Sequence, residues 1–392
     1  MQNFSFSSPT KFEFGRNAEE RIGKLAAVYG RKALVHFGMG TFVKVNGILD
    51  RVINSLESAG VATVELGGAQ PNPLDRKVYE AIDLCRKEKV DVIIAVGGGS
   101  VIDSAKATAI GVKYDGDFWD FFSGKAAPIE KIPLGVVLTI PAAGSEGSIS
   151  SVITKEEGLL KRSCDCDLMR PEFAALNPEL AATLPSYQTA CGAADIIAHV
   201  MECYITNTPG GDFADRLCEA TIQSVMHNTR ILINEAGNYN ARANVMWASM
   251  VANNDLLSVG RLQDWSSHLI EHELSGLYNV THGAGLAVIL PAFLRYQYKT
   301  NVMRIAQFGN RVFGISLDFE NPELTALESI DRLEAFFREI GLPTTFKELG
   351  AKEKDIPELA AKCYINSKGE LIGQFNPLTS KQVEEIYRLA CE

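Results

Sequence analysis

The chain has 392 residues, of which 46% are hydrophobic and 22% are charged, a composition typical of a folded globular protein with two or three domains. Its formal net charge of −10 argues against general binding to nucleic acid or to an anionic membrane surface, because both require clustered positive charge. The chain has no secretion-signal pattern at its start and no apolar stretch near the ~18–20 residues that cross a bilayer. We therefore expect a cytoplasmic protein whose eight scattered cysteines are free thiols, with the pair Cys164 and Cys166 in a loop and without a metal.

The first half of the chain alternates between two kinds of apolar pattern. Phe4–Phe6 and Lys11–Phe14 alternate with period two, which predicts a hairpin at the edge of a sheet. Continuous apolar runs of strand length then alternate with amphipathic segments of helical period. The predicted strands are 33–37, 61–66, 91–96 and 134–140, and the predicted helices are 43–56, 74–85 and 101–110. Such alternation predicts an α/β domain with a parallel sheet that helices cover on both faces.

The pattern changes after Leu184-Pro185, and the rest of the chain is almost wholly helical in period. The clearest predicted helices are 189–204, 213–233, 241–257 and 324–340. We therefore expect an α/β domain over residues 1–185 and an all-helical domain over residues 186–392.

Gly97-Gly98-Gly99-Ser100 lies between a predicted buried strand and a predicted helix. Glycines let the backbone approach a ligand closely, and a helix start offers unpaired N–H groups with a partial positive charge. This position at the carboxyl end of a parallel strand suits a dinucleotide pyrophosphate.

The first strand ends in Gly38-Met39-Gly40-Thr41, where a dinucleotide site often carries an acidic residue that binds the adenosine ribose. No acidic residue stands here, so a 2′-phosphate has room and Thr41 can donate to it. The pattern favours NADP(H), with NAD(H) as the alternative.

Four of the six histidines fall close to one another in the helical half. Asp195 and His199 are four residues apart and share one helix face, as do His268 and His272, and His282 follows soon after. A carboxylate with three imidazoles is a good ligand set for a divalent transition metal. An alternative remains, because His268-Leu269-Ile270-Glu271-His272 also fits the H-x-x-E-H pattern of zinc peptidases.

In combination these motifs resemble the iron-containing (group III) alcohol dehydrogenases, and most closely their NADPH-dependent butanol dehydrogenase and aldehyde reductase branch. The resemblance runs from end to end. It rests on Gly97-Gly98-Gly99-Ser100-x-x-Asp103, Gly144-Ser145-Glu146, Asp195-x-x-x-His199, His268-x-x-x-His272-x9-His282 and Gln70-Pro71-Asn72-Pro73.

The resemblance implies a dehydroquinate synthase-like fold, with a dinucleotide-binding α/β domain and a helical metal domain. It also implies that His272 lies off the metal, near the nicotinamide. The implied metal ligands, for Fe²⁺ or Zn²⁺, are Asp195, His199, His268 and His282. The implied cofactor residues are Gly38, Gly40, Thr41, Asn72, Gly97, Gly98, Gly99, Ser100, Asp103, Thr139, Ser145 and Lys161.

The resemblance further implies a homodimer that reduces a small aldehyde such as butanal, or oxidises the matching primary alcohol, with His272 as a proton relay. The aromatic residues of this chain at positions 118, 119, 121, 122 and 265 are expected either to line an apolar substrate site or to belong to the core. A lyase of the dehydroquinate synthase type is the main alternative. It would need a cluster of basic residues in the helical half for a phosphate. The sequence shows no such cluster there, although Arg242 and Arg261 lie in that half.

Overall fold

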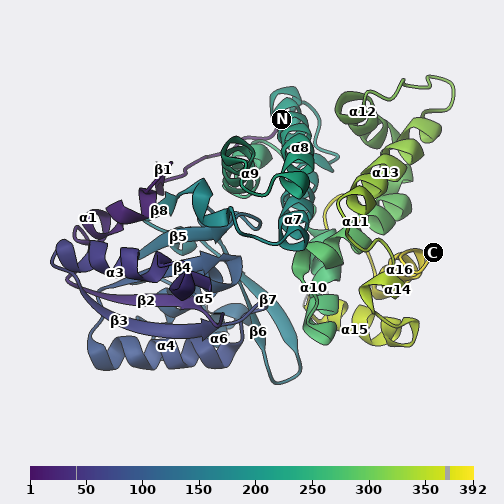
Figure 1. Cartoon of the computed structure of the whole chain (residues 1–392). Helices are drawn as coiled ribbons and strands as arrows, with labels where there is room; N and C mark the ends of the chain where they lie inside the picture. The colour runs from purple at the N-terminus through teal and green to yellow at the C-terminus, as the bar shows by residue number, and fades with distance from the viewer. Residues whose placement is uncertain (41, 367–370) are drawn as a thin grey trace. The chain divides into compact units, whose positions relative to one another are not determined.

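The computed structural model describes residues 1–40, 42–366 and 371–392, so the predicted cofactor residue Thr41 lies outside the described residues. The chain forms two compact units (Figure 1). The α/β unit comprises residues 7–184 and 237–250, and the helical unit comprises residues 1–6, 185–236 and 251–392. That residues 1–185 and 186–392 are separate domains stays a prediction.

Six parallel strands form the sheet of the α/β unit, in the order β1-β8-β5-β4-β2-β3, which confirms the predicted fold class. The strands are β1 (Lys11–Phe14), β2 (Lys32–Gly38), β3 (Ala62–Ala69), β4 (Val92–Gly98), β5 (Leu134–Ile140) and β8 (Phe173–Leu176). The central strands are continuous apolar runs because both faces of the sheet are covered.

Helices lie on both faces of this sheet because successive strand residues point to opposite sides. Leu34 and Ile93 pack in one apolar cluster with α4 (Asp75–Glu88) and α5 (Gly99–Gly111). Their neighbours Val35 and Ile94 pack in the other with α1 (Ile22–Ala26) and α3 (Ile48–Ser58). The predicted helix 43–56 is divided, since Gly47 at φ 64° separates α2 (Phe42–Val45) from α3.

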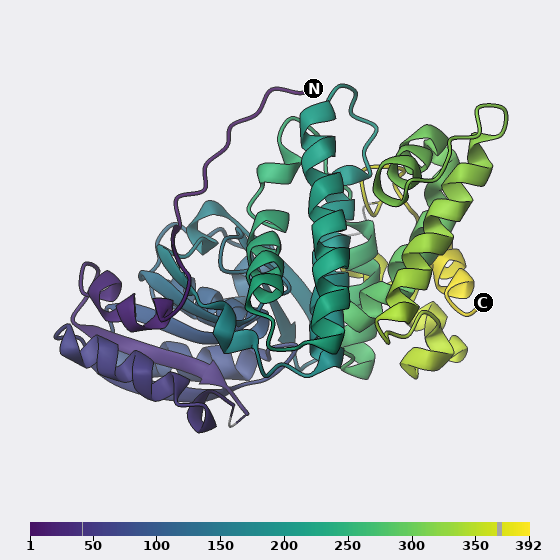
Figure 2. The same ribbon diagram turned by 45° about the horizontal axis from the view of Figure 1, so that its top comes forward.

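The predicted N-terminal hairpin is wrong. Residues 1–10 form no strand (Figure 2), and β1 instead pairs in parallel with β8. Residues 1–6 belong to the helical unit, where the Gln2 N–H donates to the carbonyl of Gly260 at 2.8 Å. Period-two alternation indicated extended backbone in this segment but could not identify its partner.

A two-stranded antiparallel hairpin, β6 (Ser150–Lys155) and β7 (Leu160–Asp165), was not predicted. It places Cys164 on a strand rather than in the expected loop, with Cys166 just beyond the strand end. All eight cysteines are free, as predicted.

Helix α9 (Tyr239–Ala252) packs within the α/β unit although it comes late in the chain. The Trp247 ring meets Phe12 and Phe14 edge to face, with ring centroids 6.1 and 5.6 Å apart. The Ser249 hydroxyl donates to the carbonyl of Ala142 at 3.1 Å. The α/β unit is therefore completed by a segment that follows it by more than fifty residues.

The helical unit is built from long helices, as predicted for this half of the chain. They are α7 (Ser186–Tyr204), α8 (Asp212–Asn234), α10 (Ser266–Tyr278), α11 (His282–Gln297), α12 (Val302–Phe313), α13 (Pro322–Glu339), α15 (Ile356–Asn366) and α16 (Ser380–Leu389). None of the helices in the described residues is both long and apolar enough to span a membrane.

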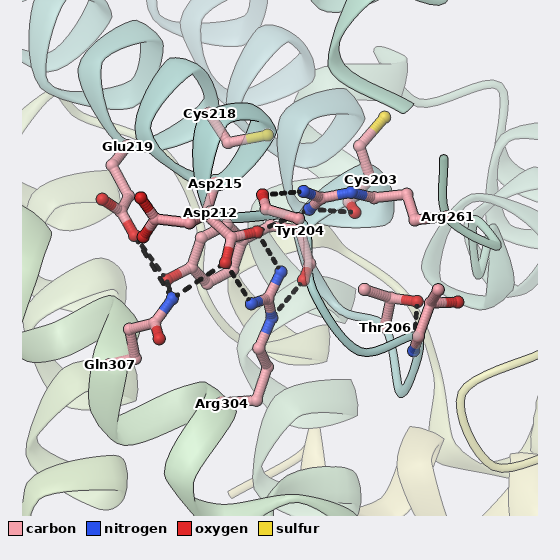
Figure 3. A network of polar contacts seen from close by, with 12 residues as sticks. Cys203, Tyr204, Thr206, Asp212, Asp215, Cys218, Glu219, Arg261, Arg304 and Gln307 are labelled. Atoms are coloured by element: carbon pink, nitrogen blue, oxygen red, sulfur yellow. Dashed lines mark hydrogen bonds and ion pairs between the residues drawn. The ribbon is translucent and has the colours of Figure 1, made fainter. Parts of the chain in front are cut away.

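A polar network joins α7, α8 and α12 within this unit (Figure 3). Asp215 accepts two hydrogen bonds from Arg304, each of 2.6 Å, and lies 2.7 Å from Arg261. The Tyr204 hydroxyl donates to Glu219 at 2.9 Å. A bidentate Arg–carboxylate pair fixes the relative orientation of the two side chains as well as their distance. This network therefore helps to align the three helices.

Gly97 is required by the close packing of α5 on β4. A Cβ atom at this position would lie 2.4 Å from Val101 Cγ2 and 2.7 Å from Val101 Cβ, whereas one at Gly38 would meet its nearest atom at 3.5 Å. We predict that Gly97→Ala costs about 1–3 kcal/mol of overpacking and lowers the melting temperature of the ligand-free protein. Gly38→Ala should leave that temperature almost unchanged, and equal losses in the two variants would contradict the prediction.

Candidate functional site

The predicted cofactor glycines meet at one edge of the sheet. Gly38 ends β2 and Gly98 ends β4, and β2 and β4 are neighbours in the sheet. Thr139 is buried near the end of the next strand, β5, where Gly98 lies opposite Ile140. Helix α5 begins directly at Gly99, so its first N–H groups, including that of Ser100, start at this edge. Such an edge suits a phosphate-bearing ligand.

Asp103 and Ser145 bind each other. The Ser145 hydroxyl donates to Asp103 Oδ1 at 2.6 Å, and the Val152 N–H donates to Asp103 Oδ2 at 3.1 Å. Burial raises the pKa of Asp103, while the nearby Lys106 ammonium lowers it. These bonds tie α5 to the turn after β5 and to β6. Asp103 and Ser145 therefore support the sheet edge from behind.

Asn72 and Lys161 are connected through the hairpin that the sequence did not predict. The Thr154 N–H donates to the carbonyl of Pro73 at 2.8 Å, and Thr154 lies opposite Lys161 in the hairpin. The hairpin thus links Lys161, which is buried, to the segment that follows β3. Gly40 lies in the bend after β2, whose Met39 N–H donates to the carbonyl of Ala69 at 2.8 Å.

The predicted metal ligands come together within the helical unit. Asp195 and His199 lie on α7, His268 lies on α10, and His282 begins α11. Asp195 Oδ1 lies 3.1 Å from His199 Nδ1, 3.8 Å from His282 Nε2 and 4.0 Å from His268 Nε2. The ligand atoms of Asp195, His268 and His282 are all within 4.8 Å of one another. The His199 ring lies beside them at an angle, with its centroid 4.5 Å from that of His268, but its ligand atoms are not part of this group.

Two atoms of this cluster fit a metal ion in particular. Asp195 Oδ1 and His268 Nε2 are buried and have no hydrogen-bond partner among the described residues. Buried polar atoms without partners are rare and costly, and a divalent cation would satisfy both atoms at once. The residues present therefore fit the metal that the sequence predicts.

The charges of Asp195 and His268 support the same interpretation. Burial alone would raise the pKa of Asp195, but His199 and the other two imidazoles outweigh it and hold the pKa well below its usual range. Burial lowers the pKa of His268 well below its usual value. An ionised carboxylate and a neutral imidazole are the forms in which these side chains bind metals.

Each of the three imidazoles is held at Nδ1 by an oxygen. His199 Nδ1 lies 2.8 Å from the carbonyl of Asp195, and His268 Nδ1 lies 2.8 Å from Glu202 Oε1. His282 Nδ1 makes a short contact with Glu271 Oε2. A neutral imidazole has one donor and one acceptor nitrogen, so a proton on Nδ1 leaves each Nε2 as the acceptor.

His272 is buried on the same helix as His268, with its ring centroid 5.5 Å from that of His282. The contacts of Glu271 argue against the peptidase alternative, in which Glu271 activates water between His268 and His272. Its carboxylate is fully buried, and it accepts from the Ser275 hydroxyl as well as contacting His282.

The aromatic residues expected at a substrate site have different positions. Residues 118, 119, 121 and 122 are buried in an apolar cluster with Ile153 and Cys164, so they belong to the core. Trp265 instead lies beside the metal cluster, with centroid distances of 5.7 Å to His199 and 5.1 Å to His268.

Sequence reasoning missed Glu202 altogether and gave Glu271 a role only in the peptidase alternative. One signal was available for Glu202, because Asp195, His199 and Glu202 recur at i, i+4 and i+7 in an otherwise apolar helix and so share a face. No comparable periodic signal marks Glu271, whose partner His282 lies on another helix.

Known proteins of one family match both halves of this chain. The family model for iron-containing alcohol dehydrogenase matches residues 9–178, and that for the C-terminal part of the Fe-containing alcohol dehydrogenase family matches residues 189–391. The chain is 38% identical over 389 residues to NADH-dependent butanol dehydrogenase A of Clostridium acetobutylicum, covering 99% of both chains. It is 32% identical over 393 residues to the NADPH-dependent aldehyde reductase YqhD of Escherichia coli, covering 100% of both.

Among solved structures, that of NADH-dependent butanol dehydrogenase A from Thermotoga maritima superposes with a TM-score of 0.96 at 37% identity. The match covers 100% of this chain and 99% of that chain. Taken with the glycine edge and the cluster around Asp195, these matches establish that the chain belongs to the iron-containing alcohol dehydrogenase family, whose members are oxidoreductases that use a nicotinamide cofactor and a divalent metal.

Proposed function

We propose that this protein transfers hydride between NADP(H) and a small aldehyde or primary alcohol, of the size of butanal and butanol, at a metal held by Asp195, His199, His268 and His282. The observation that carries the proposal is the buried Asp195 carboxylate beside imidazoles whose Nδ1 atoms are already occupied. When bound, the nicotinamide supplies the hydride and the divalent metal polarises the carbonyl. All four ligands offer N or O atoms, which suits Fe²⁺ or Zn²⁺.

The chain's own residues would orient the reactants and move the proton. Trp265 supplies an apolar surface next to His199 and His268, which suits the alkyl part of a small substrate better than a sugar. His272 is the proposed proton relay, because an imidazole titrates near neutral pH and this one lies beside His282.

The proposed preference for NADP(H) rests on the end of β2. Gly38, Met39 and Gly40 leave room for a 2′-phosphate and offer no carboxylate to a ribose hydroxyl. The chain matches both an NADH-dependent and an NADPH-dependent relative, so NAD(H) is the alternative cofactor. An assay with each cofactor decides between them. A homodimer and a cytoplasmic location also stay predictions.

A lyase of the dehydroquinate synthase type is less well supported. It would need free basic residues for a phosphate-bearing substrate in the helical unit. Arg261 is instead paired with Asp215, and Arg242 belongs to the α/β unit through α9.

The assay that tests this function follows the oxidation of NADPH, and separately of NADH, in the presence of butanal. The protein is loaded with Fe²⁺ or with Zn²⁺, or is stripped with a chelator. We expect metal-dependent oxidation that is faster with NADPH and is lost after chelation. Activity with NADH alone would contradict the interpretation of the β2 end. No activity with a panel of aldehydes in metal-loaded protein would favour the lyase.

His272→Ala separates the proposed relay from the metal ligands. We expect kcat to fall by about 10²–10⁴-fold, the usual contribution of a positioned acid or base, while the bound metal per chain is unchanged. Metal content by elemental analysis is the check. A variant that loses its metal would show that His272 is a ligand.

A further inference from the structure

Two buried glutamates contact metal-cluster imidazoles from outside the cluster. Glu202 reaches His268 Nδ1 from α7, and Glu271 reaches His282 Nδ1 from α10. From these contacts we infer that Glu202 and Glu271 are positioning residues that set the tautomer and direction of His268 and His282 for the metal. The inference rests on the proposed metal site and adds to it residues that hold its ligands.

The surroundings of Glu202 hold it in one orientation. Its Oε1 accepts from the Ser267 hydroxyl and from the His268 N–H at 3.2 Å, and its Oε2 accepts from the Trp265 N–H at 2.7 Å. These N–H and hydroxyl donors favour the carboxylate form of Glu202, which can only accept, so the His268 nitrogen that faces Oε1 donates to it. The proton of the His268 ring therefore lies on Nδ1, and Nε2, which faces Asp195, presents its lone pair.

Glu271 holds the second ring in the same way. The Ser275 hydroxyl donates to its Oε1, which leaves Oε2 for His282 Nδ1. Glu271, His272 and His282 also bring ligand atoms within 4.8 Å of one another, like a second metal cluster that shares His282. With Nδ1–H donating to Glu271 and Nε2 facing Asp195, His282 serves one metal with Glu271 behind it, so the second cluster is a support for the first.

Gly285 makes room for the Glu271 carboxylate. A Cβ atom at Gly285 would lie 2.3 Å from Glu271 Oε1 and 2.9 Å from its Cδ, and Ser275 prevents the carboxylate from turning away freely. Gly283 also lies on α11, where a Cβ atom would lie 2.0 Å from the carbonyl oxygen of Cys191 on α7. The two glycines let the helix that begins with His282 approach both neighbours.

The test measures Co²⁺ and Zn²⁺ affinity of the full chain by competition with a chromophoric chelator, together with the visible spectrum of the Co²⁺ form. We expect Glu202→Gln and Glu271→Gln to weaken binding by about 10–100-fold and to shift the Co²⁺ bands, the usual result of losing such a support. Gly285→Ala should weaken binding in the same direction without any change of charge.

Glu219→Gln is the matched control, because Glu219 is a buried glutamate that accepts from a hydroxyl, that of Tyr204 (Figure 3). Its other described partners, Gln307, Arg311 and Arg216, lie outside the metal cluster. Its affinity and Co²⁺ spectrum should match those of the unmodified chain. Melting temperatures of the metal-free proteins report folding, and Ser267→Ala and Ser275→Ala replace any glutamine variant that does not fold.

The possible failures are distinct. Wild-type affinity and spectrum in the Glu202, Glu271 and Gly285 variants, or equal weakening in Glu219→Gln, would overturn this inference and leave the proposed function standing. An unmodified chain that binds neither Co²⁺ nor Zn²⁺ would overturn the metal site on which both depend.

Discussion

The site in the helical unit depends on the direction of ring nitrogens around one buried carboxylate. An imidazole can offer Nε2 to a cation only while Nδ1 has somewhere to place its proton. Here three different oxygens accept that proton, namely the backbone carbonyl of Asp195, the carboxylate of Glu202 and the carboxylate of Glu271. Because these groups lie on α7 and α10 and the rings lie on α7, α10 and α11, the three helices must keep one register. The polar network around Asp215 aligns α7 with α8 and α12 in the same unit, and the close approach of α11 at Gly283 completes the packing.

Much of the fold could be predicted because the physical signal was local. Buried parallel strands are short apolar runs, and β2, β4 and β5 differ from the predicted ranges by two residues or fewer at each end. The hairpin of β6 and β7 was missed because it stands outside the main sheet and carries polar residues such as Ser151 and Lys161. The Ser151 hydroxyl donates to the Asp103 carbonyl at 2.8 Å, so the hairpin is held by tertiary contacts that periodicity does not record. The prediction of an N-terminal hairpin was wrong because alternation near Phe4 does not indicate which element the segment pairs with.

In the candidate site, too, features with a local sequence signal could be predicted and contacts between separate elements could not. Spacing of four residues predicted that Asp195 shares a face with His199, and the structure brings Asp195, His268 and His282 together. The support of His282 could not be predicted from spacing, because Glu271 contacts it from a different helix. At the sheet edge, the glycines were predicted from their place between strand and helix. Asp103 was predicted among the cofactor residues from the resemblance, and its observed contacts are with Ser145 and Val152.

Helix α9 has a consequence for how the protein is made. Because β1 packs against Trp247, one of the first strands to leave the ribosome must wait for a segment synthesised more than two hundred residues later before it gains those contacts. The α/β unit is thus built from parts of high sequence separation, and such contacts slow folding because a long loop must close first. Until α9 arrives, Phe12 and Phe14 lack these ring contacts at the edge of the nascent sheet, where apolar strands without neighbours invite aggregation. The late helix makes completion of the α/β unit an event after the midpoint of translation, so a fragment ending near residue 185 would carry β1 without its Trp247 contacts.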